Sequence, residues 1–149
     1  MYISTRRGFT LLELLVVVAI IGILSAIVLA MLNSSRIDGR DSKRVGDIKQ
    51  LSTALQFYYD KNLIYPPDLA SLVTQGFIGV LPNDPVGQTS YHYDQVASGG
   101  SFHLAASLER SGNKAFTSDR DSVSDTINGA DTADCTGATN GRYCYDVVP

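Results

Sequence analysis

Residues Arg6-Arg7-Gly8-Phe9-Thr10-Leu11-Leu12-Glu13 lead directly into an aliphatic run that ends at Leu32. A helix over residues 9–32 reaches about 36 Å at about 1.5 Å per residue, and a hydrocarbon core is about 30 Å thick. This segment is therefore long enough to span a membrane. A charged side chain inside a bilayer is costly, so Glu13 indicates a specific role for its carboxylate.

The basic leader, the Gly-Phe-Thr-Leu-Leu-Glu motif and the aliphatic run together resemble the amino-terminal signal of type IV pilins and type II secretion pseudopilins. The resemblance implies that a prepilin peptidase cuts after Gly8 and methylates the new amino terminus, Phe9. It also implies that Glu13 meets the terminal amine of a neighbouring subunit during filament assembly. An ordinary secretory signal peptide has a shorter apolar run. We therefore expect a leader at 1–8, a transmembrane and assembly helix at 9–32, and an exported head at 33–149.

The basic residues and the other features of the chain predict opposite orientations in the membrane. Arg6 and Arg7 precede the apolar run, whereas five cations follow it, and the positive-inside rule counts such residues near the ends of a span. Counted alone, these cations would keep the bulk of the chain in the cytoplasm. A leader that resembles one processed on the cytoplasmic face, and a cysteine pair near the carboxyl end, favour an exported domain instead. The five cations are Arg36, Arg40, Lys43, Arg44 and Lys49.

Length and charge limit the function classes. Of the 149 residues, those after the apolar run suffice for one small globular domain with a modest core. The formal net charge of -3 provides no basic footprint for nucleic acid. His92 and His103 stand apart in expected strands, and the chain has no phosphate loop or nucleophile elbow. An enzyme is therefore not expected.

An amphipathic helix is expected at 42–61. Its apolar residues recur at spacings of three and four, which is the period of a helix with one buried stripe. Of the three aromatic residues at 57–59, two continue this stripe, which favours a core role over stacking or electron transfer. The stripe consists of Val45, Ile48, Leu51, Leu55 and Tyr58, with Ser52 and Tyr59 beside them.

The polar segment 33–41 lies between the apolar run and this helix, and it contains Gly39. Glycine inside a helix costs about 1 kcal/mol relative to alanine, so this segment is a candidate joint within one long helix. Members of the family usually carry a proline near the end of the apolar run. Here the equivalent position falls near Ala30, and the first proline is Pro66. Gly22 and Gly39 are the remaining candidates for a bend.

The remainder of the chain predicts a short helix and a small sheet. Asp68 is expected to cap a helix at 69–75 that Gly76 ends. Residues 91–96 and 102–108 are rich in aromatic and aliphatic side chains, and the Ala-Ser-Gly-Gly between them is typical of a hairpin. A third strand is expected at 142–148. The predicted fold class is α+β: a long amino-terminal helix, half transmembrane and half amphipathic, packed on a small antiparallel sheet.

Three landmarks in the middle of the chain strengthen the resemblance. They are Asp60-Lys61-Asn62, Tyr65-Pro66-Pro67 and Leu81-Pro82-Asn83-Asp84-Pro85. Each is similar to a corresponding landmark of major pseudopilins and of short pilins built on the same plan. The resemblance thus covers roughly residues 6–95.

The last third of the chain is polar and acidic, and it offers a candidate calcium site. Ca²⁺ takes six to eight oxygen ligands at about 2.3–2.6 Å, which carboxylates on a flexible loop can supply. The resemblance adds that major pseudopilins bind calcium in a carboxy-terminal loop. The spacing matches no EF-hand loop, and the alternative is a merely solvated loop. The candidate ligands are Asp119, Asp121, Asp125, Asp131 and Asp134.

Cys135 and Cys144 enclose a turn-rich segment that can bring their sulfur atoms together. Two cysteines in an exported domain are more often bridged than free. In the chain-entropy model, closing a loop this short stabilises the fold by roughly 2–3 kcal/mol. We expect a disulfide that fastens the tail of the head, as disulfides do in many pilins; two unpaired buried thiols are the alternative.

These features predict a structural subunit that polymerises through its apolar helix into a type IV pilus-like filament. One alternative is the major pseudopilin of a type II secretion system, which the chain length and the tyrosine-proline and leucine-proline landmarks favour, whereas the cysteine pair favours an extracellular pilus. Another alternative is a membrane-anchored binding module that never polymerises. The expected partners are further copies of the chain, the prepilin peptidase, the inner-membrane assembly machinery and the membrane. The expected location is the inner membrane before assembly, and an extracellular pilus or periplasmic pseudopilus afterwards. No cofactor is expected apart from the candidate calcium ion.

Overall fold

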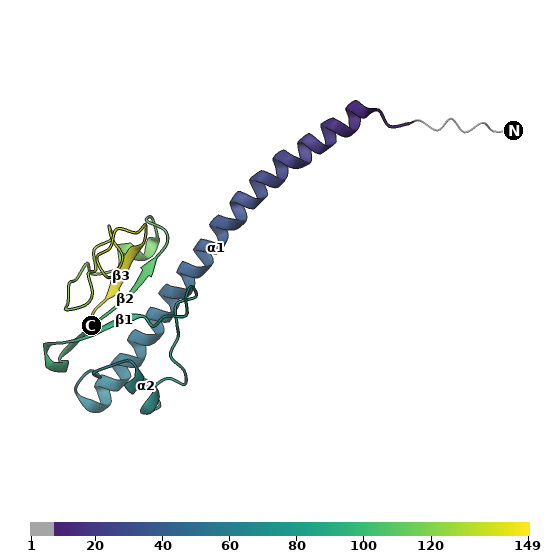
Figure 1. The fold of residues 1–149 in the computed structure, drawn as a ribbon. Helices are drawn as coiled ribbons and strands as arrows, with labels where there is room; N and C mark the ends of the chain where they lie inside the picture. Colours follow the sequence, from purple (N-terminus) through teal and green to yellow (C-terminus); the bar gives the residue numbers. More distant parts are fainter. Residues whose placement is uncertain (1–7) are drawn as a thin grey trace. The chain divides into compact units, whose positions relative to one another are not determined.

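The computed structural model describes residues 8–149, so the leader except Gly8 lies outside the described part. The chain divides into two compact units, one ending at Arg36 and the other comprising Ile37–Pro149. Helix α1, Leu11–Asn62, runs through both units without a break (Figure 1). The polar segment 33–41 is therefore helical, and Gly39 lies inside the helix.

In the first unit, α1 carries aliphatic side chains on all its faces, and they are exposed throughout the run that ends at Leu32. This part of α1 is long and apolar enough to cross a membrane. A helix that is apolar all round needs an apolar environment, either lipid or other helices. Within residues 8–149, no other part of the structure covers these side chains.

In the second unit, α1 buries the stripe expected from its spacing. Ile48, Leu51 and Leu55 are fully buried and Tyr58 nearly so, while Phe57 is 58% exposed. Below α1, α2 spans Ala70–Thr74, and Asp68 Oδ1 accepts the backbone N–H of Ser71 at 2.9 Å. Gly76 follows with a φ of 78°, the left-handed conformation that ends helices.

A three-stranded antiparallel sheet packs against α1, in the order β1-β2-β3. The strands are β1, His92–Val96, β2, Ser101–Leu108, and β3, Tyr143–Val147, as Figure 1 shows. A short 3-10 helix, η1, Ala97–Gly99, joins β1 to β2. Gly99 is required there, since a Cβ would lie 2.2 Å from Cγ1 of Ile64. A second one, η2, Lys114–Thr117, follows β2.

The central strand β2 is buried on both faces, and its side chains alternate between two environments. Phe102, Leu104, Ala106 and Leu108 join the main core with α1. Ala105 belongs to a smaller cluster with Ile127 and the two cysteines. The helix therefore covers one face of the sheet and the polar tail covers the other. The α+β fold expected from the sequence is confirmed.

Candidate functional site

At the start of α1, Thr10 and Glu13 cap the helix reciprocally. Glu13 Oε2 accepts the backbone N–H of Thr10 at 3.1 Å and its hydroxyl at 3.0 Å. In return, Thr10 Oγ1 accepts the backbone N–H of Glu13 at 3.2 Å. This arrangement is a capping box, which satisfies N–H groups that have no partner inside the helix. The Thr-x-x-Glu spacing is the sequence signature of this cap, so Glu13 has a role within its own chain as well as the intermolecular role predicted from the sequence.

The residues around the expected cleavage point are open. Gly8, Phe9 and Thr10 are all exposed, and a Cβ on Gly8 would meet no atom within 4 Å. Glu13 and the apolar run after it are exposed as well. The structure thus leaves the peptide bond after Gly8 accessible.

Three of the five candidate calcium ligands converge in the acidic loop, by which we mean residues 118–131. One carboxylate oxygen each of Asp119, Asp121 and Asp131 lies within 4.8 Å of the other two. Asp119 Oδ2 and Asp131 Oδ1 are buried atoms that no hydrogen bond satisfies. Asp121 has a φ of 48°, a conformation uncommon outside glycine.

The electrostatics of this group favour a cation. Burial, followed by the charge of Asp131, raises the pKa of Asp119 to about 7. The pKa of Asp131 is raised as well, chiefly by burial and then by Asp121. Like charges held together in a partly buried site disfavour ionisation of each other. A divalent cation of the calcium type, which prefers carboxylate oxygens, fits this donor set.

The other two candidate ligands lie outside this group. Asp125 is exposed. Asp134 organises the following turn: its Oδ1 accepts the backbone N–H groups of Thr136 and Ala138 at 2.9 and 3.0 Å. Its Oδ2 accepts the side-chain N–H of Asn140 at 2.5 Å. Asp134 therefore shapes the loop between the cysteines.

A disulfide joins Cys135 and Cys144, and both residues are fully buried. The backbone N–H of Cys135 donates to Ser107 Oγ on β2 at 3.2 Å. The backbone N–H of Cys144 donates to the carbonyl of Ala133 at 2.8 Å. The bridge therefore holds the tail against the face of the sheet opposite α1.

Arg44 is fully buried and lies at the centre of a cluster of ionised side chains. The sequence pattern does not predict this cluster. The Nε and Nη2 atoms of Arg44 donate to the two carboxylate oxygens of Asp84 at 2.6 and 2.9 Å. Its Nη1 donates to Asp41 Oδ1 at 2.8 Å and to Glu109 Oε1 at 2.7 Å. Asp41 in turn accepts the backbone N–H groups of Glu109 and Arg110. The cluster ties α1 to the Leu-Pro-Asn-Asp-Pro landmark and to the end of β2.

The charges in this cluster depend on one another. The hydrogen bond from Arg40 is the main cause that lowers the pKa of Glu109 from 4.5 to about 2; burial opposes it, and Arg44 adds to it. A lowered carboxyl pKa stabilises the fold above the ordinary pKa, and this contribution is lost as the pH falls through the lowered one. The pairing of Glu109 therefore stabilises the head above about pH 4.5 and is lost toward pH 2.

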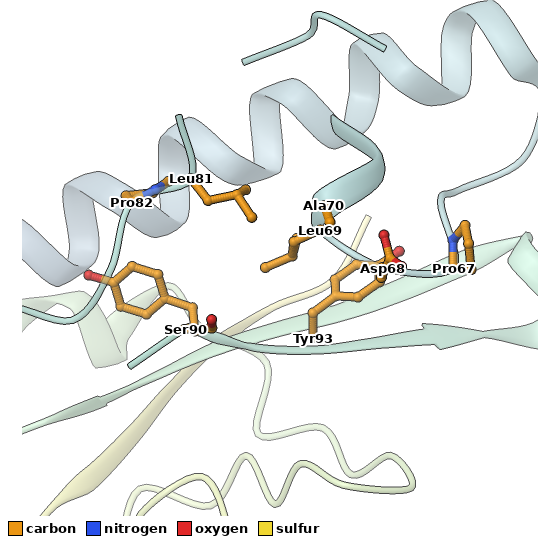
Figure 2. A pocket seen from close by; sticks show the side chains of 9 residues that line it. Pro67, Asp68, Leu69, Ala70, Leu81, Pro82, Ser90 and Tyr93 are labelled. Carbon is orange, nitrogen blue, oxygen red and sulfur yellow. The ribbon is translucent and has the colours of Figure 1, made fainter. Parts of the chain in front are cut away.

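A cavity of about 290 Å³ opens beside α2 and β1. Figure 2 shows Leu69, Leu81 and Tyr93 directed toward it, with Asp68 and Pro67 at one side. Binding pockets usually combine apolar walls with several convergent polar groups. This lining is largely apolar, and Asp68 is already engaged with Ser71. The cavity therefore offers no catalytic arrangement.

The chain is similar to a family model at its amino-terminal end and to curated proteins over more than half of its length. The prokaryotic N-terminal methylation motif matches residues 3–29. The type II secretion system core protein G of Vibrio cholerae is 38% identical over 103 residues, covering 59% of this chain and 70% of that protein. The protein of the same name from Pseudomonas aeruginosa is 34% identical over 115 residues, covering 66% of this chain and 80% of that protein.

The chain belongs to the type IV pilin and pseudopilin family. As a member of this family it is a structural subunit and not an enzyme, as the sequence indicated. The similar proteins carry the name of a secretion pseudopilin, so they favour the alternative in our sequence reading over the extracellular pilus. The expectation of an extracellular pilus rested on the cysteine pair, which lies in the head domain.

Proposed function

We propose that this pilin-family chain is a pseudopilin of a type II secretion system, which polymerises into a short periplasmic filament. The observation that carries the proposal is the similarity to core protein G, which extends over 70% and 80% of two such proteins. A match of that extent includes much of the head as well as the shared amino-terminal motif.

The exposed apolar part of α1 supports assembly through this helix. Its side chains are uncovered in the isolated chain, with Leu11 and Leu12 at 81% and 74% exposure. Lipid covers them while the chain is a single-pass protein of the inner membrane. In a filament, the same helices of neighbouring subunits replace the lipid, and van der Waals packing between them takes over.

The carboxylate of Glu13 contributes to this assembly by pairing with a positive charge on a neighbouring subunit. Cleavage after Gly8 creates a positive amine at Phe9, one residue before the capping box of Thr10 and Glu13. Opposite charges attract more strongly in a low-dielectric environment than in water. The Phe9 amine of one subunit and Glu13 of the next therefore pair as a subunit leaves the membrane, with the inner-membrane machinery as the assembly partner.

Deleting the gene in its own host tests the assignment to secretion. A pseudopilin predicts that exported proteins accumulate in the periplasm while surface pili, viewed by electron microscopy, are unchanged. Loss of surface pili with normal secretion identifies a type IV pilin instead. If purified subunits never form filaments and neither process changes, a non-polymerising binding module is favoured.

Blocking the processing step is expected to keep the leader on the chain. Replacing Gly8 by leucine introduces no clash within the chain, since a Cβ at this position meets nothing within 4 Å. Any effect then reflects recognition by the peptidase. Intact-mass analysis of the membrane fraction is expected to show wild type beginning at methylated Phe9, and Gly8→Leu retaining residues 1–8. Gly22→Ala, at an equally open position, is the matched control, and wild type that keeps its leader contradicts the assignment.

We further propose that the acidic loop binds Ca²⁺ through Asp119, Asp121 and Asp131. Two buried carboxylate oxygens without a hydrogen bond support this proposal, because buried polar atoms in proteins are nearly always satisfied. The bound cation would neutralise the mutual repulsion of these carboxylates and so order the acidic loop.

Calcium is expected to raise the melting temperature of the full-length protein in detergent. A ligand that binds only the folded form at 100 times its dissociation constant stabilises it by about 2.7 kcal/mol. Asp119→Asn is expected to abolish the rise, whereas Asp125→Asn, outside the group and exposed, should retain it. Differential scanning fluorimetry with calcium, magnesium or chelator measures the effect. An equal rise with magnesium would exclude a calcium-selective site.

A further inference from the structure

One polar residue from each strand contributes to a connected set on the tail-facing side of the sheet. Asp94 of β1 is paired with His103 of β2, and Asp146 of β3 is paired with Ala105, two residues from His103 and on the same face. His103 and Asp146 are 1% and 0% exposed. His103 Nε2 lies 2.7 Å from Asp146 Oδ2, and Nδ1 lies 2.9 Å from Ser124 Oγ.

The same residues hold the acidic loop. Asp146 accepts the backbone N–H groups of Arg120 and Asp121 on Oδ1, and that of Ser122 on Oδ2, at 3.0 to 3.2 Å. In the middle of the loop, Asp94 Oδ2 accepts the Ser124 hydroxyl at 2.5 Å and the backbone N–H of Thr126 at 2.8 Å. His103 bridges the two carboxylates through Ser124. The loop is thus attached at two points that share one imidazole ring.

Both carboxyl groups are surrounded by hydrogen-bond donors, which favour the ionised form. Burial alone would raise the pKa of Asp146, but hydrogen bonds from His103 and from the loop backbone bring it below the ordinary value. Burial likewise opposes ionisation of Asp94, and hydrogen bonds from Ser124 and Thr126 outweigh it. Each is therefore an acceptor only.

The protonation state of the His103 ring follows from the protons that its neighbours can donate. Asp146 has no proton to give, so Nε2 of His103 must donate to it. Ser124 has a single hydroxyl proton, which goes to Asp94 Oδ2. The Nδ1 atom must therefore donate to Ser124 Oγ. A histidine that donates from both nitrogens is an imidazolium.

We propose that His103 is a buried imidazolium latch that fastens the acidic loop to the sheet through Asp146 on one nitrogen and Ser124 on the other. A neutral ring can satisfy Ser124 only by taking the hydroxyl proton from Asp94, which leaves a carboxylate oxygen without that donor. It also leaves Asp94 of β1 and Asp146 of β3 without the cation between them. These two carboxylates and the Ser124 hydroxyl are the groups that face the ring.

The latch is distinct from a hydrolytic triad, although it contains a serine, a histidine and an aspartate. A catalytic histidine accepts the proton of the serine hydroxyl. Here Nδ1 donates to Ser124, and the hydroxyl proton is directed at Asp94. The ring has no free lone pair, so it can hold the loop but cannot act as a base.

Nitrogen-15 NMR of the full-length protein in detergent tests the protonation state. The sample contains chelator throughout, so the result does not depend on calcium or on filament assembly. At pH 6.5, His103 is expected to show two protonated ring nitrogens. His92, whose pKa burial lowers, is the internal control and should show a neutral ring. A neutral pattern for His103 at this pH overturns the proposal.

Hydrogen exchange tests the attachment of the loop. Protection factors of the Arg120, Asp121 and Ser122 amides are expected to fall about tenfold in His103→Gln, with the amides of β2 changed less than twofold. His92→Gln is the matched control and should leave the loop unchanged. Ser124→Ala, which removes the hydroxyl between Nδ1 and Asp94, should show the same loss of loop protection, which also decides the matter if His103→Gln does not fold. Unchanged loop protection in either experiment contradicts the latch.

Discussion

Replacing Glu13 by alanine is expected to abolish filament assembly while leaving cleavage and membrane insertion intact. The charge of this residue is costly in lipid unless the Phe9 amine of a neighbouring subunit pairs with it. Alanine removes both the cost of a charge in lipid and the carboxylate that would pair with the Phe9 amine. Filaments are counted by electron microscopy after shearing and quantified by immunoblot, with intact mass confirming the methylated Phe9. Normal amounts of filament from Glu13→Ala would mean that helix packing alone carries assembly.

Two further variants separate this charge from the capping box. Glutamine suits the third helical position of a capping box nearly as well as glutamate, so Glu13→Gln keeps the local hydrogen bonds but loses the charge. We expect it to assemble almost as poorly as the alanine variant. Thr10→Ala removes the capping partner of Glu13 and keeps the charge, so it should still form filaments. If Thr10→Ala fails and Glu13→Gln succeeds, the residue acts by capping α1.

Replacing Arg44 by methionine is expected to destabilise the head by about 3–5 kcal/mol, since removing one partner leaves buried charges uncompensated. Arg44 contacts Asp41, Asp84 and Glu109 at 2.6 to 2.8 Å. A loss of this size is a large share of the 5–15 kcal/mol typical of folded domains. Urea unfolding of the full-length protein in detergent, followed by near-ultraviolet circular dichroism, measures it.

Lys49 provides the matched control for this prediction. It is a cation on the same helix, but it is exposed, and Lys49→Met should change the free energy of unfolding by about 0.5 kcal/mol or less. If Arg44→Met proved as stable as this control, the ion cluster would be no more stabilising than a well-packed apolar side chain. Its role would then be to set the register of α1 against the landmark loop.

The pattern of the sequence was sufficient for the local structure. The stripe from Val45 to Tyr58, the Gly76 stop and the hairpin at 97–100 all rest on spacing or on turn chemistry within a few residues. Each is present in the structure. The amino-terminal motif likewise identified the family, because the leader, Gly8 and Glu13 are contiguous in the chain.

The amino-acid sequence taken alone could not decide between a pilus subunit and a secretion pseudopilin. Cys135 and Cys144 favour a pilus when the sequence is taken alone, and the structure does contain a disulfide between them. A disulfide stabilises a head domain in either setting. Similarity to core protein G, which extends over most of its length, is what favours secretion.

By itself, the sequence determined the helices and strands of this protein, its exposed apolar helix and the family to which the chain belongs. Only the tertiary structure decided which polar residues meet. Arg44 and Glu109 are 65 residues apart, His103 and Asp146 are 43 apart, and three of five acidic candidates converge while Asp125 and Asp134 do not. The physical reason is that periodicity reports which face of one element is apolar, whereas ion pairs and ligand groups depend on how distant elements pack.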